Sequence, residues 1–367
     1  MPKVIPAEAA ALDDLRARLR ATRWPDMPEE AGWELGIDVA CLRDLVAYWA
    51  DGFDWRAQES ALDQFPHVRR NGVHAIHARG VGPAPFPLVL CHGWPDSFWR
   101  YLKVIPLLTD PGGHGGDPAD AFDVVVPDMP GYGYSARPAQ PLNAIDVADL
   151  WAALMTDLGH RRFGAAGGDM GSHVARYLAL DHPDRVTAVH RTDVGLPVFT
   201  GDPASLSREE REFLRHAAEW GAREGAYGMM HRTKPQTAAV GLNDSPAGLA
   251  AWIVEKMHAW SDPGYSFTRD DLLTNVTIYW LTGTIGSSIR MYHANAAIDP
   301  AQLQRRVEVP SGFTLFAGDV VRPPHAWLHR VANTVRINEV PRGGHFAPFE
   351  QPEAYARELR DFFRPYR

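Results

Sequence analysis

The chain has 367 residues and a formal net charge of −8, with both signs spread along it and no long basic run. Its length suffices for one large or two ordinary domains, and the charge pattern argues against nucleic acid as a partner. No segment has the apolar length of a membrane helix, the first residues lack a signal-peptide pattern, and Cys41 and Cys91 make no disulfide framework. We therefore expect a soluble, cytoplasmic protein without a membrane anchor.

The first part of the chain predicts helices without a core of their own. Leu12, Leu15 and Leu19 have helical spacing within residues 8–22, and residues 39–49 repeat this pattern. We expect residues 1–70 to form an N-terminal helical extension.

From about residue 73 the pattern changes to short apolar runs that end in turns rich in Gly or Asp. Helical stretches lie between several of these runs, at residues 145–158 and 171–179. Buried apolar strands that alternate with helices predict an α/β fold with a mostly parallel central sheet. The expected strands are residues 73–78, 87–91, 122–126, 162–166 and 186–190.

A largely helical block follows, with helices expected at residues 211–220, 247–260 and 272–279. Strand signals return at residues 311–316 and 334–337, and a final helix is expected at 353–363. The simplest account is one sheet whose chain is interrupted by a helical cap. The expected division is an extension at 1–70, a core at 71–196 and 306–367, and a cap at 197–305.

Asp169 stands in a glycine-rich stretch between a predicted strand and a predicted helix, Gly167-Gly168-Asp169-Met170-Gly171. A polar residue flanked by glycines at this place is typical of a nucleophile elbow, because a Cβ would clash in the tight turn. The N-terminus of the helix favours a negative charge, so this aspartate should stay ionised. A carboxylate that attacks carbon gives an alkyl ester, which points to epoxides or alkyl halides as substrates. A Gly-Asp loop that only caps a helix remains an alternative.

An elbow nucleophile needs an acid and a histidine, which follow it in that order along the chain. Asp319 and His345 have this order, and each follows a predicted strand, at the edge where open parallel sheets bind ligands. The backbone N–H groups of Trp94 and Met170 are expected to form an oxyanion hole. A proline follows Trp94, and we expect a cis bond there.

Several further motifs extend this pattern over nearly the whole chain. They are Thr22-Arg23-Trp24-Pro25-Asp26, His92-Gly93-Trp94-Pro95, Gly131-Tyr132-Gly133-Tyr134-Ser135, Lys234-Pro235-Gln236-Thr237 and Gly343-Gly344-His345-Phe346. Together they resemble the epoxide hydrolases of the α/β-hydrolase superfamily, in the branch that carries an N-terminal extension and includes the microsomal enzymes. The resemblance implies an α/β-hydrolase fold and a cofactor-independent enzyme that hydrolyses an epoxide to a vicinal diol.

The resemblance also implies roles for individual residues. Asp169 would form the ester, His345 with Asp319 would activate water, and the cap tyrosines Tyr227 and Tyr292 would donate hydrogen bonds to the epoxide oxygen. The family more often has tryptophan at the position of Met170, which affects only the pocket shape because the backbone N–H would act there.

Two other functions stay open. A haloalkane-type dehalogenase would also use an elbow aspartate, and a catalytically silent member of the fold would only bind small molecules. A serine esterase is disfavoured because no G-x-S-x-G motif occurs. His74 and His77 have no cysteine or glutamate partner at zinc spacing, so we expect no metal. The expected partners are an epoxide and water; the identity of the epoxide, the stereochemistry, the biological role and a homodimer are left open.

Overall fold

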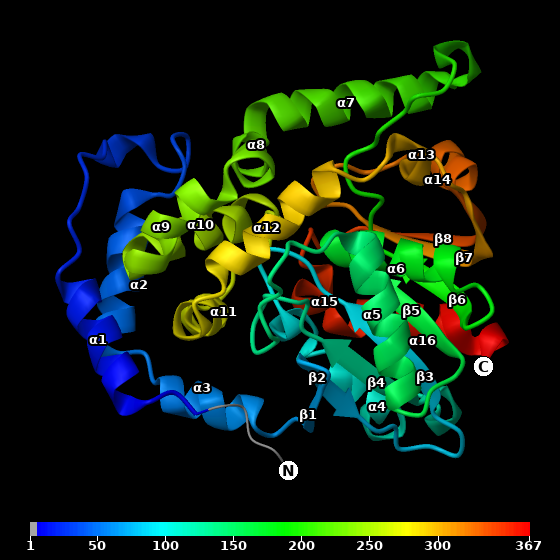
Figure 1. Ribbon diagram of the computed structural model, residues 1–367, viewed down its shortest axis with the longest axis horizontal. Coiled ribbons are helices and arrows are strands. Elements are labelled where there is room, and N and C mark those ends of the chain that lie inside the picture. Colours follow the sequence, from blue (N-terminus) through cyan, green and yellow to red (C-terminus); the bar gives the residue numbers. More distant parts are fainter. Residues whose placement is uncertain (1–5) are drawn as a thin grey trace.

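The structure is a computed structural model that describes residues 6–367. Its centre is one eight-stranded sheet with the order β1-β2-β4-β3-β5-β6-β7-β8 (Figure 1). Strand β2 pairs antiparallel with β1 and β4, and all other neighbouring strands are parallel. The expected α/β fold with a mostly parallel sheet is confirmed. The strands are β1 (His67–Arg70), β2 (Val73–Ala78), β3 (Phe86–Cys91), β4 (Phe122–Pro127), β5 (Phe163–Gly167), β6 (Val186–Arg191), β7 (Val307–Phe316) and β8 (Ala332–Val340).

Strands β2 to β8 form where the apolar runs predicted them, because buried parallel strands consist of continuous apolar residues. Strand β1 was not predicted. It forms a hairpin with β2 through Asn71 and Gly72, whose φ angles are +50° and +79°. Asparagine followed by glycine is a strong hairpin signal because both residues tolerate positive φ. The sheet therefore begins inside the span expected to be the extension.

Helices cover both faces of the sheet. Helix α6 packs on β5 and β6 and against α5. Both helices lie in front of the sheet in Figure 1. Helix α16 packs on β6, β7 and β8 and against α4. Together, the side chains of the helices on the two faces bury the apolar strands. The helices are α4 (Ile105–Thr109), α5 (Ala144–Asp157), α6 (Met170–Asp181), α14 (His325–Val331), α15 (Ala347–Glu350) and α16 (Pro352–Phe363).

The cap forms a helical layer over the loops at the carboxyl ends of β3 and β4. Asn275 donates from its amide to the carbonyl of Pro95 at 2.8 Å, and the Ser287 hydroxyl donates to the carbonyl of Gly131 at 2.6 Å. The expected helical block is observed, and it places side chains above the end of β5. Its helices are α7 (Arg208–Glu224), α8 (Ala226–Thr233), α9 (Pro235–Asp244), α10 (Pro246–Ala259), α11 (Arg269–Thr282), α12 (Ile285–Ala296) and α13 (Pro300–Leu303).

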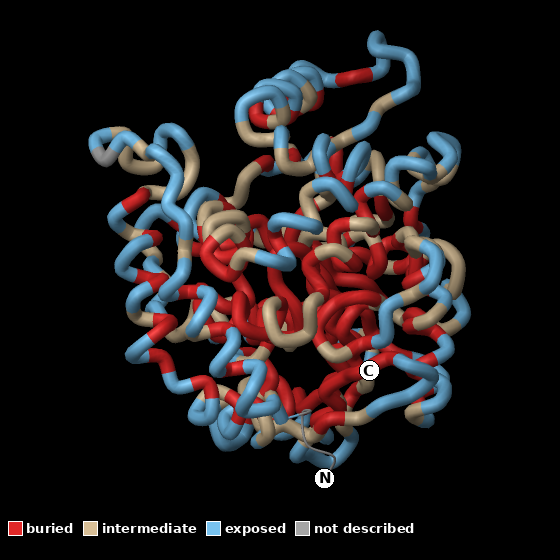
Figure 2. Tube along the Cα trace, turned by 60° about the vertical axis from the view of Figure 1, so that its left-hand side comes forward, coloured by how far each residue is buried: buried red, intermediate tan, exposed pale blue. Residues whose placement is uncertain are grey.

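The N-terminal helices α1 (Ala9–Arg20), α2 (Val39–Asp51) and α3 (Trp55–Leu62) pack along the cap helices α10 and α11. Their apolar side chains, such as Leu15 and Leu45, belong to the same buried cluster as the core strands. Figure 2 shows the buried segments gathered in the interior, where these parts meet. Within residues 6–367, no helix combines the length and apolar character needed to cross a membrane.

Candidate active site

Asp169 lies at a sharp turn between β5 and α6, with a φ of +57° that few side-chain residues adopt. Neighbouring glycines make this turn sterically feasible. A Cβ on Gly171 would lie 1.9 Å from the carbonyl oxygen of Cys91, and one on Gly93 would lie 2.2 Å from Oδ1 of Asp169. The chain therefore forms a strained elbow that holds a carboxylate at the carboxyl edge of the sheet.

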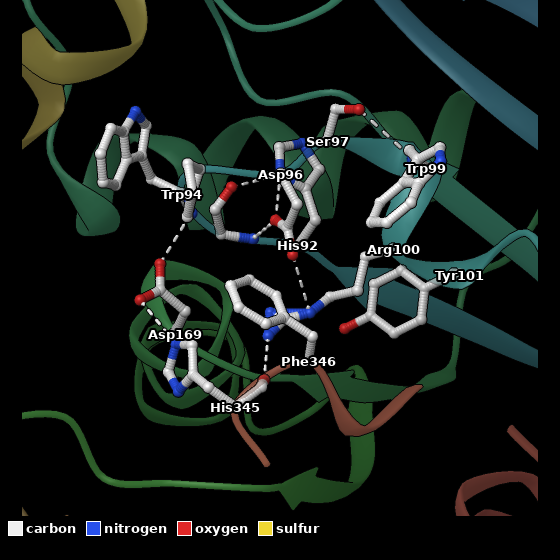
Figure 3. Close-up of polar contacts among 12 residues, drawn as sticks. His92, Trp94, Asp96, Ser97, Trp99, Arg100, Tyr101, Asp169, His345 and Phe346 are labelled. Atoms are coloured by element: carbon white, nitrogen blue, oxygen red, sulfur yellow. Dashed lines mark hydrogen bonds and ion pairs between the residues drawn. The ribbon is translucent and has the colours of Figure 1, made fainter. Parts of the chain in front are cut away.

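The carboxylate of Asp169 is held from two sides (Figure 3). Its Oδ1 accepts the backbone N–H of Trp94 at 2.8 Å, and its Oδ2 lies 3.1 Å from Nε2 of His345. The backbone N–H of Met170 also stabilises the negative charge of this carboxylate. Both backbone groups that the sequence predicted as an oxyanion hole thus act on the charge of Asp169, and the Trp94 N–H is directed at its Oδ1. The bond between Trp94 and Pro95 is cis, as expected.

The predicted acid and histidine lie beside the predicted nucleophile. His345 follows β8 and Asp319 follows β7, and Nδ1 of His345 is 2.8 Å from Oδ1 of Asp319. Asp319, His345 and Asp169 expose only 5%, 8% and 15% of their side chains. The structure brings together three residues that are far apart in the sequence, in one hydrogen-bonded row.

The charges of neighbouring groups favour the ionised forms of Asp169 and His345. Burial opposes the negative charge of Asp169, but His345 and the N–H groups of Trp94 and Met170 outweigh it and lower the pKa of Asp169 to about 2. Burial likewise opposes a charged His345, but the carboxylates of Asp319 and Asp169 raise its pKa well above the usual value. The pair therefore rests as a carboxylate beside an imidazolium.

The cap supplies an aromatic wall opposite this row. The ring of Tyr227, from α8, stacks on the Trp94 indole at 5.5 Å, and the Tyr292 ring, from α12, lies 6.0 Å from both. Burial raises the pKa of both phenols, and the nearby charge of Asp169 adds to this shift. Both phenols stay protonated at neutral pH. The two phenols interact with each other, and the Tyr292 hydroxyl makes no hydrogen bond of good geometry within residues 6–367.

His231 lies one turn after Tyr227 on α8, and its place in this wall was not predicted from the sequence. Its Nε2 accepts the indole N–H of Trp252 at 3.1 Å, so the proton of the neutral ring is on Nδ1. Burial and the charge of Lys256 lower the pKa of His231 to about 3. Its spacing of four residues from Tyr227 was the available signal, since both side chains share one helix face.

Asp193 was not predicted either. It follows β6, its Oδ2 accepts the backbone N–H of Asp169 at 2.7 Å, and it is 6% exposed. Burial and the charge of Asp319 raise the pKa of Asp193. The signal was its place at the carboxyl end of a strand next to β5. Residues 6–367 contain no cluster of three or more His, Cys, Asp or Glu side chains arranged to hold a metal ion.

A parallel sheet with a nucleophile elbow, an acid after β7 and a histidine after β8 defines an α/β hydrolase. Family models agree with this class. The model described as "Epoxide hydrolase N terminus" matches residues 2–101, and the model described as "alpha/beta hydrolase fold" matches residues 87–224.

The relatives extend over the whole chain. The chain is 39% identical to a protein of Stigmatella aurantiaca, over 100% of this chain and 85% of that protein. It is 33% identical to epoxide hydrolase 1 of Oryctolagus cuniculus, over 96% of this chain and 86% of the relative. The structure is similar to that of Aspergillus niger epoxide hydrolase, with a TM-score of 0.87, 29% identity, and coverage of 100% of this chain and 97% of the other. The chain belongs to the epoxide hydrolase family.

Proposed function

We propose that this protein hydrolyses an epoxide to a vicinal diol through a covalent ester on Asp169. The observation that carries this proposal is an ionised elbow carboxylate, bonded to Trp94 N–H and His345, beneath two protonated cap tyrosines. Because the chain belongs to the epoxide hydrolase family, the reactants are a small-molecule epoxide and water.

In the first step, Oδ2 of Asp169 attacks one epoxide carbon. A bond forms between that oxygen and the carbon, and the ring C–O bond breaks to leave an alkoxide. Tyr227 and Tyr292 are the donors for this alkoxide, because neutral phenols can donate a hydrogen bond where charge develops. The alkoxide takes a proton from the tyrosine side of the site. The imidazolium of His345 supplies this proton in the end, through the tyrosines or through water. No base is needed, because a carboxylate with a pKa of about 2 is already the nucleophile.

Ester formation prepares the second step. It removes the negative charge of Asp169, which is one of the two carboxylates that hold the proton on His345. His345 thereby becomes neutral, oriented by Asp319, and takes a proton from the water that attacks Cγ of the ester. The oxyanion forms on Oδ1, where the N–H groups of Trp94 and Met170 stabilise it. The ester bond breaks, and Oδ2 leaves in the diol with the proton from His345. The new carboxylic acid group of Asp169 then passes its proton to His345, which restores a carboxylate beside an imidazolium.

A single turnover in heavy-oxygen water tests this function. With enzyme in excess over epoxide, the first diol should carry no heavy oxygen, because its added oxygen comes from Asp169 rather than from the solvent. Heavy oxygen in nearly all of the first diol would mean direct attack by water and would contradict the proposal. A panel of styrene-oxide-type, aliphatic and bulky polycyclic epoxides then defines the substrate class.

Two other functions are less well supported by the same residues. A haloalkane-type dehalogenase would also use Asp169, with N–H donors for a halide. The two phenols of Tyr227 and Tyr292 favour an epoxide oxygen instead. A silent binder would show no turnover with any epoxide of the panel. We also propose the division into an extension (1–70, whose last residues form β1 of the sheet), a core (71–196 and 306–367) and a cap (197–305). We further propose a cytoplasmic location, which the free cysteines Cys41 and Cys91 support.

A further inference from the structure

A buried ion pair lies beside the candidate active site, in the segment after β3 and against the loop after β8 (Figure 3). Asp96 and Arg100 are 0% and 1% exposed, and Nε of Arg100 lies 3.1 Å from Oδ2 of Asp96. Removing two charges from water is costly, and apolar residues could fill the same space without that cost. The pair is therefore best explained by what each partner holds.

Asp96 binds the loop that carries the oxyanion donor, and Arg100 binds the backbone of the histidine. Oδ1 of Asp96 accepts the backbone N–H of Gly93 at 3.1 Å, directly before the oxyanion donor Trp94. Nη2 of Arg100 donates to the main-chain carbonyl of His345 at 2.5 Å. A continuous chain of contacts thus runs from the oxyanion loop through the two charges to the backbone of the histidine.

The surroundings keep this chain of contacts in one arrangement. The carbonyl of Asp96 accepts the Tyr279 hydroxyl at 2.7 Å, and the guanidinium of Arg100 packs over the Phe346 ring at 5.5 Å. A guanidinium presents several N–H donors in a rigid plane, so it can reach Asp96 and the His345 carbonyl together. A lysine ammonium at the same place carries the charge but lacks this fork.

We propose that Asp96 and Arg100 are positioning residues that fix His345 relative to the oxyanion donor Trp94, and that they serve hydrolysis of the ester more than its formation. This inference rests on the proposed function. Ester formation needs the carboxylate of Asp169, oriented toward the epoxide carbon, and the two cap tyrosines. Hydrolysis also needs a water aligned between His345 and the ester carbon while Trp94 holds the ester oxygen. A misplacement of about 1 Å at such a point can cost about 100-fold in rate.

Two variants separate positioning from folding. Arg100→Lys keeps the buried charge but not the fork. The double variant with Asp96→Asn and Arg100→Met removes both charges and keeps an amide oxygen for Gly93. Arg364→Lys is the matched control, because Arg364 forms a peripheral ion pair with Asp120 at 2.6 Å.

The measurement is rapid mixing of excess enzyme with an epoxide that the wild type turns over, with styrene oxide as the first probe. Quenched samples are analysed by intact-protein mass, which follows the ester as it forms and decays. In both variants we expect the ester to form at close to the wild-type rate and to decay about 10- to 100-fold more slowly. The control should match the wild type in both steps.

The outcomes are distinguishable. If Arg100→Lys hydrolyses the ester at the wild-type rate, the fork is not needed and the inference is overturned. If both steps slow equally in a folded variant, the pair has a general structural role and the inference also fails. Should the double variant not fold, Arg100→Lys alone decides. A wild type that forms no ester on Asp169 contradicts the proposed function itself, whatever the variants do.

Discussion

The row of Asp169, His345 and Asp319 on the core side differs from two polar groups on the cap side in how completely its members are paired. On the core side, both oxygens of Asp169 and both ring nitrogens of His345 have hydrogen-bond partners. On the cap side, the Tyr292 hydroxyl and Nδ1 of His231 have none within residues 6–367. Buried donors usually have acceptors, and exceptions often mark functional groups. The contrast fits a catalytic row that is organised before the substrate arrives and a tyrosine donor on the cap that the substrate oxygen completes.

The strongest way to break this comparison is to remove the base from the core side. His345→Gln should form the ester once and then stall, with multiple turnover reduced on the order of 10,000-fold. Intact-protein mass spectrometry should show a gain of one substrate on the peptide that contains Asp169. The exposed His325, which pairs with Glu339 on the surface, supplies the control His325→Gln. Turnover at the wild-type rate in His345→Gln would show that His345 is not the base.

The cap side is tested by removing its phenol groups. Tyr227→Phe and Tyr292→Phe should each slow ester formation by about 10- to 1,000-fold, the cost of losing one donor to a developing oxyanion. The double variant should nearly abolish it, while the hydrolysis of any ester formed stays close to the wild-type rate. Tyr366→Phe, near the C-terminus, is the control. Unchanged ester formation in both single variants would mean that the donors are misassigned.

The pH dependence of the two steps sharpens the comparison. Asp169 is ionised above its lowered pKa of about 2, so the rate constant of ester formation should be flat from pH 8 down to about pH 5. In the ester, His345 has lost the carboxylate of Asp169, and hydrolysis requires its neutral form. Hydrolysis should therefore fall as pH decreases, by about tenfold per unit below the pKa of His345 in the ester. Quenched-flow measurement of each step checks this; parallel pH profiles would contradict it.

The smallest effect is expected within the cap wall. Trp252→Phe removes the N–H that His231 accepts, which leaves a buried ring nitrogen without its donor. This should cost about 1–3 kcal/mol of unfolding free energy, because a buried acceptor becomes unsatisfied. Ester formation should change little, because the tyrosine hydroxyls are retained. Denaturant unfolding together with single-turnover kinetics checks both parts, and a large kinetic loss without destabilisation would assign His231 a direct role.

The sequence predicted the sheet and the position of the site because both follow local patterns. Apolar runs placed β2 to β8, and the glycines around Asp169 indicated the elbow, because a tight turn between a strand and a helix leaves no room for larger residues. Strand β1 was missed because it is short and carries Arg69 and Arg70, which hide the apolar pattern, although Asn71-Gly72 indicated the turn.

The supporting contacts could not be predicted in the same way. Arg100 and His345 are 245 residues apart in sequence, and no periodicity links them. Asp193 and His231 have strand-end and helix-face positions that many structural residues share. Which of these side chains reach the elbow is decided by tertiary packing, and a single sequence does not encode that in a local pattern.

In the proposed reaction, the two oxygens of Asp169 have different fates. Oδ1 is bound by Trp94 N–H, whereas Oδ2, which faces His345, leaves with each molecule of product. Water then supplies the replacement atom at the position of Oδ2. As long as the carboxylate does not rotate, one oxygen is permanent and the other is renewed in every cycle. After many cycles in isotopically enriched solvent, the peptide carrying Asp169 should gain one heavy oxygen atom and not two. The number of heavy atoms in this peptide therefore records whether the carboxylate of Asp169 ever rotates between cycles.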